Sequence, residues 1–118
     1  MGHQKSKKLF TTVASGIQGR WYNFATDEIL IFSPTEAPLE VSDVLIIKDG
    51  VAHSDHYLLG FCATGEIYAL IGDERRISNA TVKIITEDSL ILQQPDCKML
   101  IYERRKDTSF ADDLIAAL

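Results

Sequence analysis

The sequence predicts an all-β protein: a single antiparallel meander β-barrel of about eight strands with a short helix at each end. Runs of β-branched and aromatic residues recur about every 8–12 residues between turn residues, which is the pattern of an all-β sandwich or barrel. The turns are tight, and this favours antiparallel pairing between strands that are adjacent in sequence. A chain of 118 residues has the size of one domain.

The expected strands follow one another between clear turn signals. Ser33-Pro34 ends one strand, and Asp49-Gly50 predicts a two-residue hairpin turn because glycine adopts a positive φ without steric cost. Apolar and polar residues alternate within segments such as residues 81–84. The expected strands are residues 20–24, 28–32, 39–48, 51–61, 66–71, 77–86, 89–93 and 98–104.

Helical patterns occur only near the two ends of the chain. Near the start, four apolar residues share one helical face: Phe10, Val13, Ala14 and Ile17. Near the other end, Ser109 and Asp112 resemble a helix N-cap pair, and apolar residues follow at helical spacing up to Leu118. We expect residues 1–8 to be a disordered tail or a cloning remnant and residues 9–118 to form the single barrel domain.

The protein has a formal net charge of −5, which is unevenly distributed. Lys5, Lys7 and Lys8 precede a body with nine basic and seventeen acidic residues, a net charge of −8 from residue 9 onward. Phosphate contacts need clustered cations, so we expect no nucleic-acid partner. We also expect no membrane span and no signal peptide. The protein would be cytoplasmic, or secreted or in the cell envelope if the chain starts at a processed N-terminus.

Two of the three histidines lie in the segment His53-Ser54-Asp55-His56. On a strand His53 and Asp55 face one way and His56 the other, so one metal ion could not take both histidines without a bulge. Zinc needs three or four ligands, and the chain has no nucleophile elbow and no phosphate-binding glycine loop. We therefore predict no metal, no cofactor, no catalytic residue and a protein that is not an enzyme.

The two cysteines suggest no special chemistry. Cys62 and Cys97 fit no metal-binding or redox spacing. We expect two buried free thiols, with a single disulfide as the alternative if the protein reaches an oxidising compartment.

Two short motifs give the predicted barrel a family resemblance. Gly19-Arg20-Trp21 opens the first strand directly after the expected helix, and Tyr102-Glu103-Arg104 lies on the last strand. This arrangement resembles the lipocalin-like (calycin) proteins. The resemblance implies that Trp21 lies at the closed base of the barrel and that Arg104 packs across its indole, a contact of about 0.5–2 kcal/mol. A pleckstrin-homology-like barrel of seven strands with a C-terminal helix is the alternative fold.

The resemblance implies a non-enzymatic protein that binds a small apolar or amphipathic ligand inside the barrel, where aromatic side chains would line the cavity. The expected ligand-binding residues are Phe32, Tyr57, Phe61 and Tyr68. The alternative is a protein–protein interaction module, such as an inhibitor or immunity-type protein, whose acidic surface meets a basic partner. Asp73 and Glu74 would contribute to that surface. The sequence leaves the ligand, the partner and the oligomeric state open.

Overall fold

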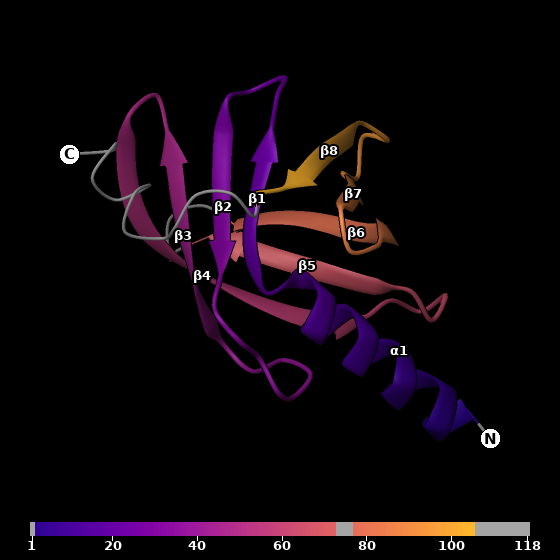
Figure 1. The fold of residues 1–118 in the computed structure, drawn as a ribbon. Helices are drawn as coiled ribbons and strands as arrows, with labels where there is room; N and C mark the ends of the chain where they lie inside the picture. Colours follow the sequence, from indigo (N-terminus) through magenta and orange to yellow (C-terminus); the bar gives the residue numbers. More distant parts are fainter. Residues whose placement is uncertain (1, 73–76, 106–118) are drawn as a thin grey trace.

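The computed structural model describes residues 2–72 and 77–105, and within them the chain forms one helix and eight strands. The strands close into a barrel in which each strand pairs with its sequence neighbours and β8 returns to β1 (Figure 1). The predicted all-β meander is thus confirmed, and a closed ring of eight strands replaces the seven-strand alternative. The strands are β1 (Gly19–Asn23), β2 (Glu28–Phe32), β3 (Ser42–Lys48), β4 (Val51–Phe61), β5 (Ile67–Gly72), β6 (Ile77–Ile85), β7 (Ser89–Gln93) and β8 (Met99–Arg104).

Every pairing in the barrel is antiparallel, including the one between β1 and β8 that closes it. Trp21 lies opposite Arg104 in that closing pair. The β3–β4 hairpin turns at Asp49 and Gly50, whose φ angles of 53° and 76° are those of a two-residue type I′ turn. The register of β6 against β7 shifts between Val82 and Ile84, a bulge of the kind that bends a strand and increases its twist.

Helix α1 (Gly2–Ile17) packs against one end of the barrel. The four apolar residues expected on one helical face are all buried: Phe10, Val13, Ala14 and Ile17. Helix propensity alone is marginal for a segment of this length, so their burial stabilises it. α1 begins at Gly2 and takes in residues assigned above to a tail, because the polar residues before Leu9 are compatible with a helix. The expected C-terminal helix at residues 109–118 lies outside the described residues.

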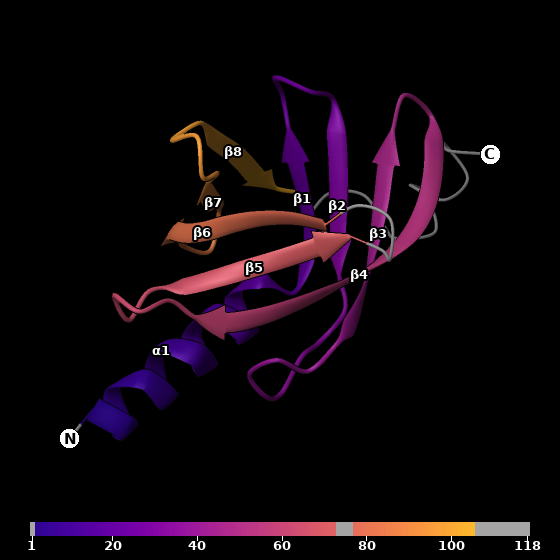
Figure 2. The ribbon, with the colours of Figure 1, turned by 180° about the vertical axis from the view of Figure 1, so that it is seen from behind.

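The barrel has two different ends. α1 and the loop between β2 and β3 lie at one end, whereas the β1–β2 and β3–β4 turns lie at the other (Figures 1 and 2). We call the first the closed end and the second the open end. Near the closed end Trp21 is fully buried, and its indole Nε1 donates a hydrogen bond of 2.9 Å to the carbonyl oxygen of Ile17. This bond fixes the last turn of α1 to the first strand.

The core occupies the middle of the barrel and draws on every strand. Its buried members from the strands are Trp21, Leu30, Phe32, Val44, Tyr57, Leu59, Ile67, Ala69, Ala80, Val82, Leu90, Leu92 and Tyr102. The buried face of α1 joins the same cluster. The helix therefore continues the core beyond the sheet at the closed end.

Two further expectations concern membrane spans and the burial of the two cysteines. In residues 2–72 and 77–105 no helix is both long enough and apolar enough to cross a membrane. Cys62 and Cys97 are free thiols, but Cys97 is exposed and Cys62 is only half-buried, so the expectation of two buried thiols is wrong. Cys97 lies in the β7–β8 turn at a φ of 68°, and such a turn lies on the protein surface.

Candidate functional site at the open end of the barrel

Inward-facing side chains become more exposed toward the open end. Residues paired across neighbouring strands share a face of the sheet, so the buried Trp21 identifies the inner face through Leu30 and Ile46. In the middle of the barrel the inner residues are buried, whereas near the open end several are only half-buried. We call these half-buried inner residues the open-end set: Glu28, Ile46, Asp55, Ile71 and Leu100.

Three members of the open-end set are apolar and come from different strands. Ile46 on β3, Ile71 on β5 and Leu100 on β8 pack against the core with one side and remain partly exposed. An eight-stranded barrel is just wide enough to be filled by side chains or to hold one small ligand. Here side chains fill the middle of the barrel, and apolar surface at the open end stays within reach of solvent.

One carboxylate of the set is held by a buried tyrosine. The hydroxyl of Tyr102 donates a hydrogen bond of 3.2 Å to Oε1 of Glu28, and Tyr102 is only 3% exposed. Burial, and then the charge of Glu28, raises the pKa of Tyr102, so the phenol stays a neutral donor. A carboxylate can accept several hydrogen bonds, and Glu28 therefore retains acceptor capacity at the barrel wall.

The second carboxylate pairs with one of the two strand histidines. Nε2 of His53 lies 3.4 Å from Oδ2 of Asp55, and the two side chains are 55% and 13% exposed. His56 lies on the opposite face of β4, where its Nδ1 is 3.1 Å from Oδ1 of Asp43. The histidines thus face different carboxylates on different sides of the sheet. Across the described part of the chain, no three histidine, cysteine or acidic residues gather in a way that could hold a metal ion.

The four aromatic residues expected to bind ligand do not converge on one site. Phe32 and Tyr57 meet edge to face with ring centroids 4.9 Å apart, and both are buried in the core. The Tyr57 hydroxyl donates to the carbonyl oxygen of Ser33. Phe61 lies near the closed end, with its ring centroid 6.3 Å from that of Phe10 on α1.

Tyr68, the fourth expected residue, is separated from the other three. It pairs with Gly60 across β4 and β5, one position away from the inner pair Leu59 and Ala69, so its side chain lies on the outer face of the sheet. A Cβ atom at Gly60 would collide with the Tyr68 ring, which shows that the ring covers this glycine. Tyr68 therefore does not face the interior with Phe32 and Tyr57.

Trp21 and Arg104, the residues expected at the barrel base, lie together. The guanidinium carbon of Arg104 is 4.0 Å from the centroid of the Trp21 ring. The neighbouring Arg105 lies in the same way over Tyr22, at 4.1 Å, but on the outer face. The two arginines therefore make similar contacts in very different surroundings.

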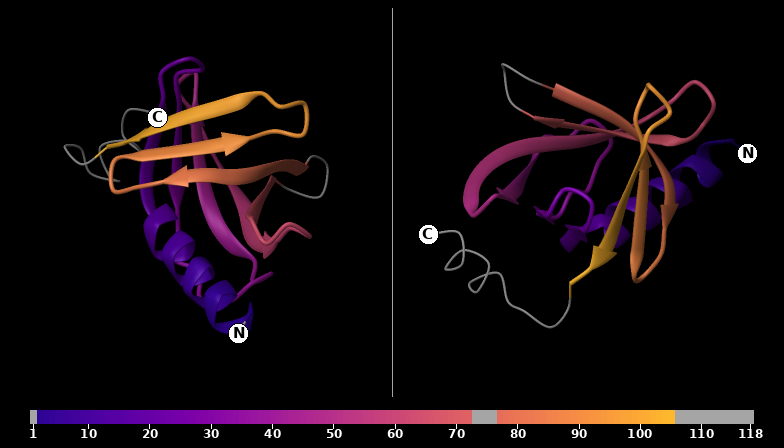
Figure 3. Two further views of the ribbon diagram at one scale, coloured as in Figure 1. Left: turned by 90° about the vertical axis from the view of Figure 1, so that its right-hand side faces the viewer. Right: turned by 90° about the horizontal axis from the view of Figure 1, so that it is seen from above.

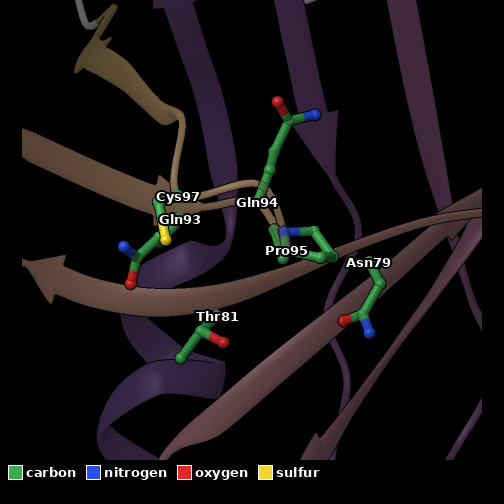
Figure 4. A pocket seen from close by; sticks show the side chains of 7 residues that line it. Asn79, Thr81, Gln93, Gln94, Pro95 and Cys97 are labelled. Carbon is green, nitrogen blue, oxygen red and sulfur yellow. The ribbon is translucent and has the colours of Figure 1, made fainter.

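The outer surface carries an open groove of about 300 Å³ beside the β7–β8 turn (Figure 4). Its lining residues are Asn79, Ala80, Thr81, Gln93, Gln94, Pro95 and Cys97. Three carboxamide side chains and one hydroxyl line it without any charge, and the exposed Cys97 thiol lies at its edge. Thr81 pairs with Gln93 across β6 and β7, next to the inner pair Val82 and Leu92, which places the groove on the outside of the barrel.

Comparison of the chain with protein-family models, with curated proteins and with solved structures finds no match. The structure itself shows a small closed antiparallel barrel of eight strands. Function must therefore be inferred from the geometry of this barrel.

The open-end set was not predicted from the sequence. The expected aromatic residues Phe32 and Tyr57 fill space in the core, whereas the partly exposed inner residues at the open end are aliphatic or acidic. One sequence pattern could have pointed to part of this set: side chains alternate between the two faces on either side of the Asp49-Gly50 turn, and this places Ile46, His53 and Asp55 on one face. It does not reveal how far along the barrel the core extends, because that depends on the arrangement of all eight strands.

Proposed function

We propose that the protein binds a small amphipathic ligand at the open end of its barrel. One observation carries this proposal: Ile46, Ile71 and Leu100 face inward yet remain partly exposed above a filled core. Apolar surface at the mouth of a barrel gains about 25 cal/mol for each Å² that a ligand removes from water. The resemblance of the Trp21 and Arg104 motifs to the lipocalin-like proteins supports the same function.

The polar residues at the open end favour a particular head group. Glu28 and Asp55 both face the interior at this end; Glu28 accepts a hydrogen bond from Tyr102, and Asp55 lies 3.4 Å from His53. A ligand with a positively charged or hydrogen-bond-donating head would complement them, whereas an anionic head would be repelled. The ligand class that fits is an alkyl or aryl body with an amine or hydroxyl head.

The experiment is a titration of isotopically labelled protein, followed by amide chemical shifts, with three probes of equal chain length: octylamine, octanol and octanoate. We expect shifts concentrated on β3, β5 and β8 near the open end. Affinity should fall in the order amine, alcohol, carboxylate. If none of the three probes shifted these amides, or if octanoate bound most tightly, the proposal would be wrong.

A pair of adjacent substitutions on β8 provides the matched control. Leu100→Trp should fill the open end and weaken octylamine binding, because Leu100 faces inward. Ile101→Trp places the same side chain on the outer face, where Ile101 is 58% exposed, and should leave probe binding unchanged. Equal effects of the two variants would show that the probe does not enter the barrel.

The loop between β2 and β3 supports a second candidate function, which is docking of a basic protein partner. Leu39 and Val41 are 60% and 63% exposed there and are accompanied by Glu36 and Glu40. The loop is ordered, since the backbone N–H of Leu39 donates a hydrogen bond of 2.8 Å to the carbonyl of Leu59. Exposed apolar groups beside carboxylates fit a basic surface with an apolar recess.

Asp73 and Glu74, which were expected to contribute to this acidic surface, lie outside the described residues. The loop can be tested on its own by using the protein as bait in an extract of its source cells. A partner retained by the wild type and by Ile101→Trp, but lost from Leu39→Asp and at raised salt, would support this function. Retention that is independent of Leu39 would count against it.

A further inference from the structure

The outer face of β6, β7 and β8 carries a row of three isoleucines. Ile84, Ile91 and Ile101 are aligned across the strands by their pairing. Ile84 is 47% exposed and Ile101 is 58% exposed, while Ile91 between them is half-buried. Three adjacent β-branched side chains therefore form a continuous apolar strip on the outside of the barrel.

A second row beside this strip is also uncharged. Thr81, Gln93 and Met99 are aligned across the same three strands, and Met99 is 48% exposed. The groove described above lies along this row, beside the β7–β8 turn. We call the two rows together the uncharged face: Thr81, Ile84, Ile91, Gln93, Met99 and Ile101.

Charged residues border the uncharged face but do not enter it. Glu103 is the next outward-facing residue after Ile101 on β8. At the β6 side of the face lies the ion pair between Lys83 and Glu66, whose Nζ and Oε2 atoms are 2.6 Å apart. Asp96 and Lys98 lie in the β7–β8 turn. The face is thus an apolar and carboxamide centre with a charged rim, which is the usual anatomy of a protein interface.

This composition is unusual for a sheet that faces water. An antiparallel sheet normally has one face on the core and polar residues on the other, and contiguous exposed apolar patches mark interaction sites. Figure 3 (left) shows β6, β7 and β8 at the front of the barrel, with no other element lying across them. Within the described chain Ile84 and Ile101 are exposed and Ile91 between them is half-buried.

We propose that the uncharged face is a self-association surface on which a second copy of this chain docks, face to face. The charge distribution supports this occupant. The chain has a net charge of −5, so contact between most parts of two copies would bring carboxylates together. The uncharged face avoids this repulsion, and a two-fold axis brings the same apolar rows together as in sheet-on-sheet packing.

The size of the face sets the expected strength of association. Two outward rows on three strands spaced about 4.8 Å apart bury no more than ~1,000 Å² in total when two copies meet, which is below the standard size of a stable interface. The dimer should therefore be reversible and dependent on concentration. Dilution should shift the amide resonances of β6, β7 and β8.

The test is sedimentation velocity over a concentration series up to ~1 mM for the wild type and three variants. Ile101→Glu and Ile101→Lys place opposite charges on the uncharged face. Val51→Glu, at the 62% exposed first residue of β4, adds the same charge as Ile101→Glu on the other side of the barrel. Far-UV circular dichroism confirms folding, and Met99→Glu replaces the Ile101 variants if these fail to fold.

We expect a wild-type dimer whose dissociation constant rises at least about tenfold in both Ile101 variants and is unchanged in Val51→Glu, because a charge of either sign is costly to bury. A wild type that stays monomeric at ~1 mM would overturn the proposal. Tighter association of Ile101→Lys would also overturn it, since the opposing surface would then be acidic and not the uncharged face. Equal weakening by Val51→Glu would place the contact elsewhere on the barrel.

Discussion

The guanidinium of Arg104 covers the indole of Trp21 and at the same time binds the backbone at the closed end of the barrel. Nη2 donates a hydrogen bond of 2.6 Å to the carbonyl of Gly16, Nη1 donates to the carbonyl of Gln18, and Nε donates to the carbonyl of Glu87 at 3.0 Å. One side chain from the last strand thus connects the end of α1, the first strand and the β6–β7 turn. Desolvation lowers the pKa of Arg104, but a guanidinium stays charged at any physiological pH.

Replacing Arg104 should destabilise the protein far more than replacing its neighbour. Arg104→Met removes charge-assisted hydrogen bonds to three carbonyls and should cost about 2–4 kcal/mol. Arg105→Met removes a more exposed contact over Tyr22 and should cost less than about 1 kcal/mol. Urea denaturation of both variants measures the difference. Equal losses of stability in the two variants would mean that the hydrogen bonds from Arg104 to the three carbonyls contribute little to stability.

Gly19 should be intolerant of a side chain for two separable reasons. Its φ is 100°, which L-residues rarely adopt, and a Cβ atom there would lie 2.7 Å from Nη1 of Arg104. We expect Gly19→Ala to cost more than Gly50→Ala, since Gly50 has a φ of 76° but open space around it. The unfavourable φ alone should account for about 1–3 kcal/mol of the stability lost in Gly19→Ala.

Combining Gly19→Ala with Arg104→Met separates the backbone strain from the collision with the guanidinium. In the Arg104→Met background the guanidinium is absent, so Gly19→Ala should cost only about as much as Gly50→Ala. An undiminished cost in the double variant would show that backbone strain accounts for the whole effect. Urea denaturation of the wild type, the three single variants and the double variant provides the five free energies of unfolding required.

The buried face of α1 should contribute to stability as a part of the core. Ile17 is fully buried, and Ile17→Ala should cost about 2–5 kcal/mol because it leaves a cavity at the closed end. Ser15→Ala, at an exposed position of the same helical turn, is the matched control and should change stability by less than about 0.5 kcal/mol. Thermal unfolding of the two variants compares them. A small loss in Ile17→Ala would indicate that α1 detaches readily.

The buried phenol of Tyr57 predicts loss of stability in alkali. Burial, and then the charge of Glu40, raises the pKa of Tyr57 to about 12. The folded state therefore keeps this proton where the unfolded chain has lost it, and ionisation favours unfolding. The contribution is fully present below a pH of about 10, the ordinary tyrosine pKa, and declines as the pH rises toward 12.

Tyr57→Phe isolates this effect. At neutral pH the variant should lose about 0.5–1.5 kcal/mol, because the hydrogen bond to Ser33 is absent. Above a pH of about 10 its stability should fall less steeply than that of the wild type. Some decline should remain, because the pKa of Tyr102 is also raised. If the urea midpoints of the wild type and of Tyr57→Phe fell equally steeply with pH, the alkaline loss of stability would not come from Tyr57.

Much of the fold could be predicted because it is encoded locally. Turn residues such as Asp49-Gly50 end the strands, and the expected strands agree with the observed ones to within a few residues. The helical face that includes Phe10 and Ile17 is also a local pattern, since 3.6-residue periodicity needs no knowledge of the rest of the chain. The observed start of α1 lies earlier than expected, because the polar residues before that face contain no residue that would end a helix.

The candidate site was less predictable because apolar residues occupy both faces of several strands. Ile29 and Ile31 flank the inward-facing Leu30, and Ile91 lies between the inward-facing Leu90 and Leu92. Composition therefore does not identify the inner face on these strands. Tyr68 shows the consequence: its residue type suggested a ligand contact, and the register of β4 and β5 places it outside, over Gly60.

By itself the sequence determined the class of structure, the order and bounds of most strands, the buried face of α1 and the opposite orientations of His53 and His56, because each follows from short-range periodicity and turn chemistry. Only the tertiary structure decided that Phe32 and Tyr57 fill the middle of the barrel and that Ile46, Ile71 and Leu100 stay partly exposed. It also decided which isoleucines remain outside on β6, β7 and β8. The physical reason is that burial depends on the packing of all strands together, and a pattern of period two cannot record where along the barrel the core ends.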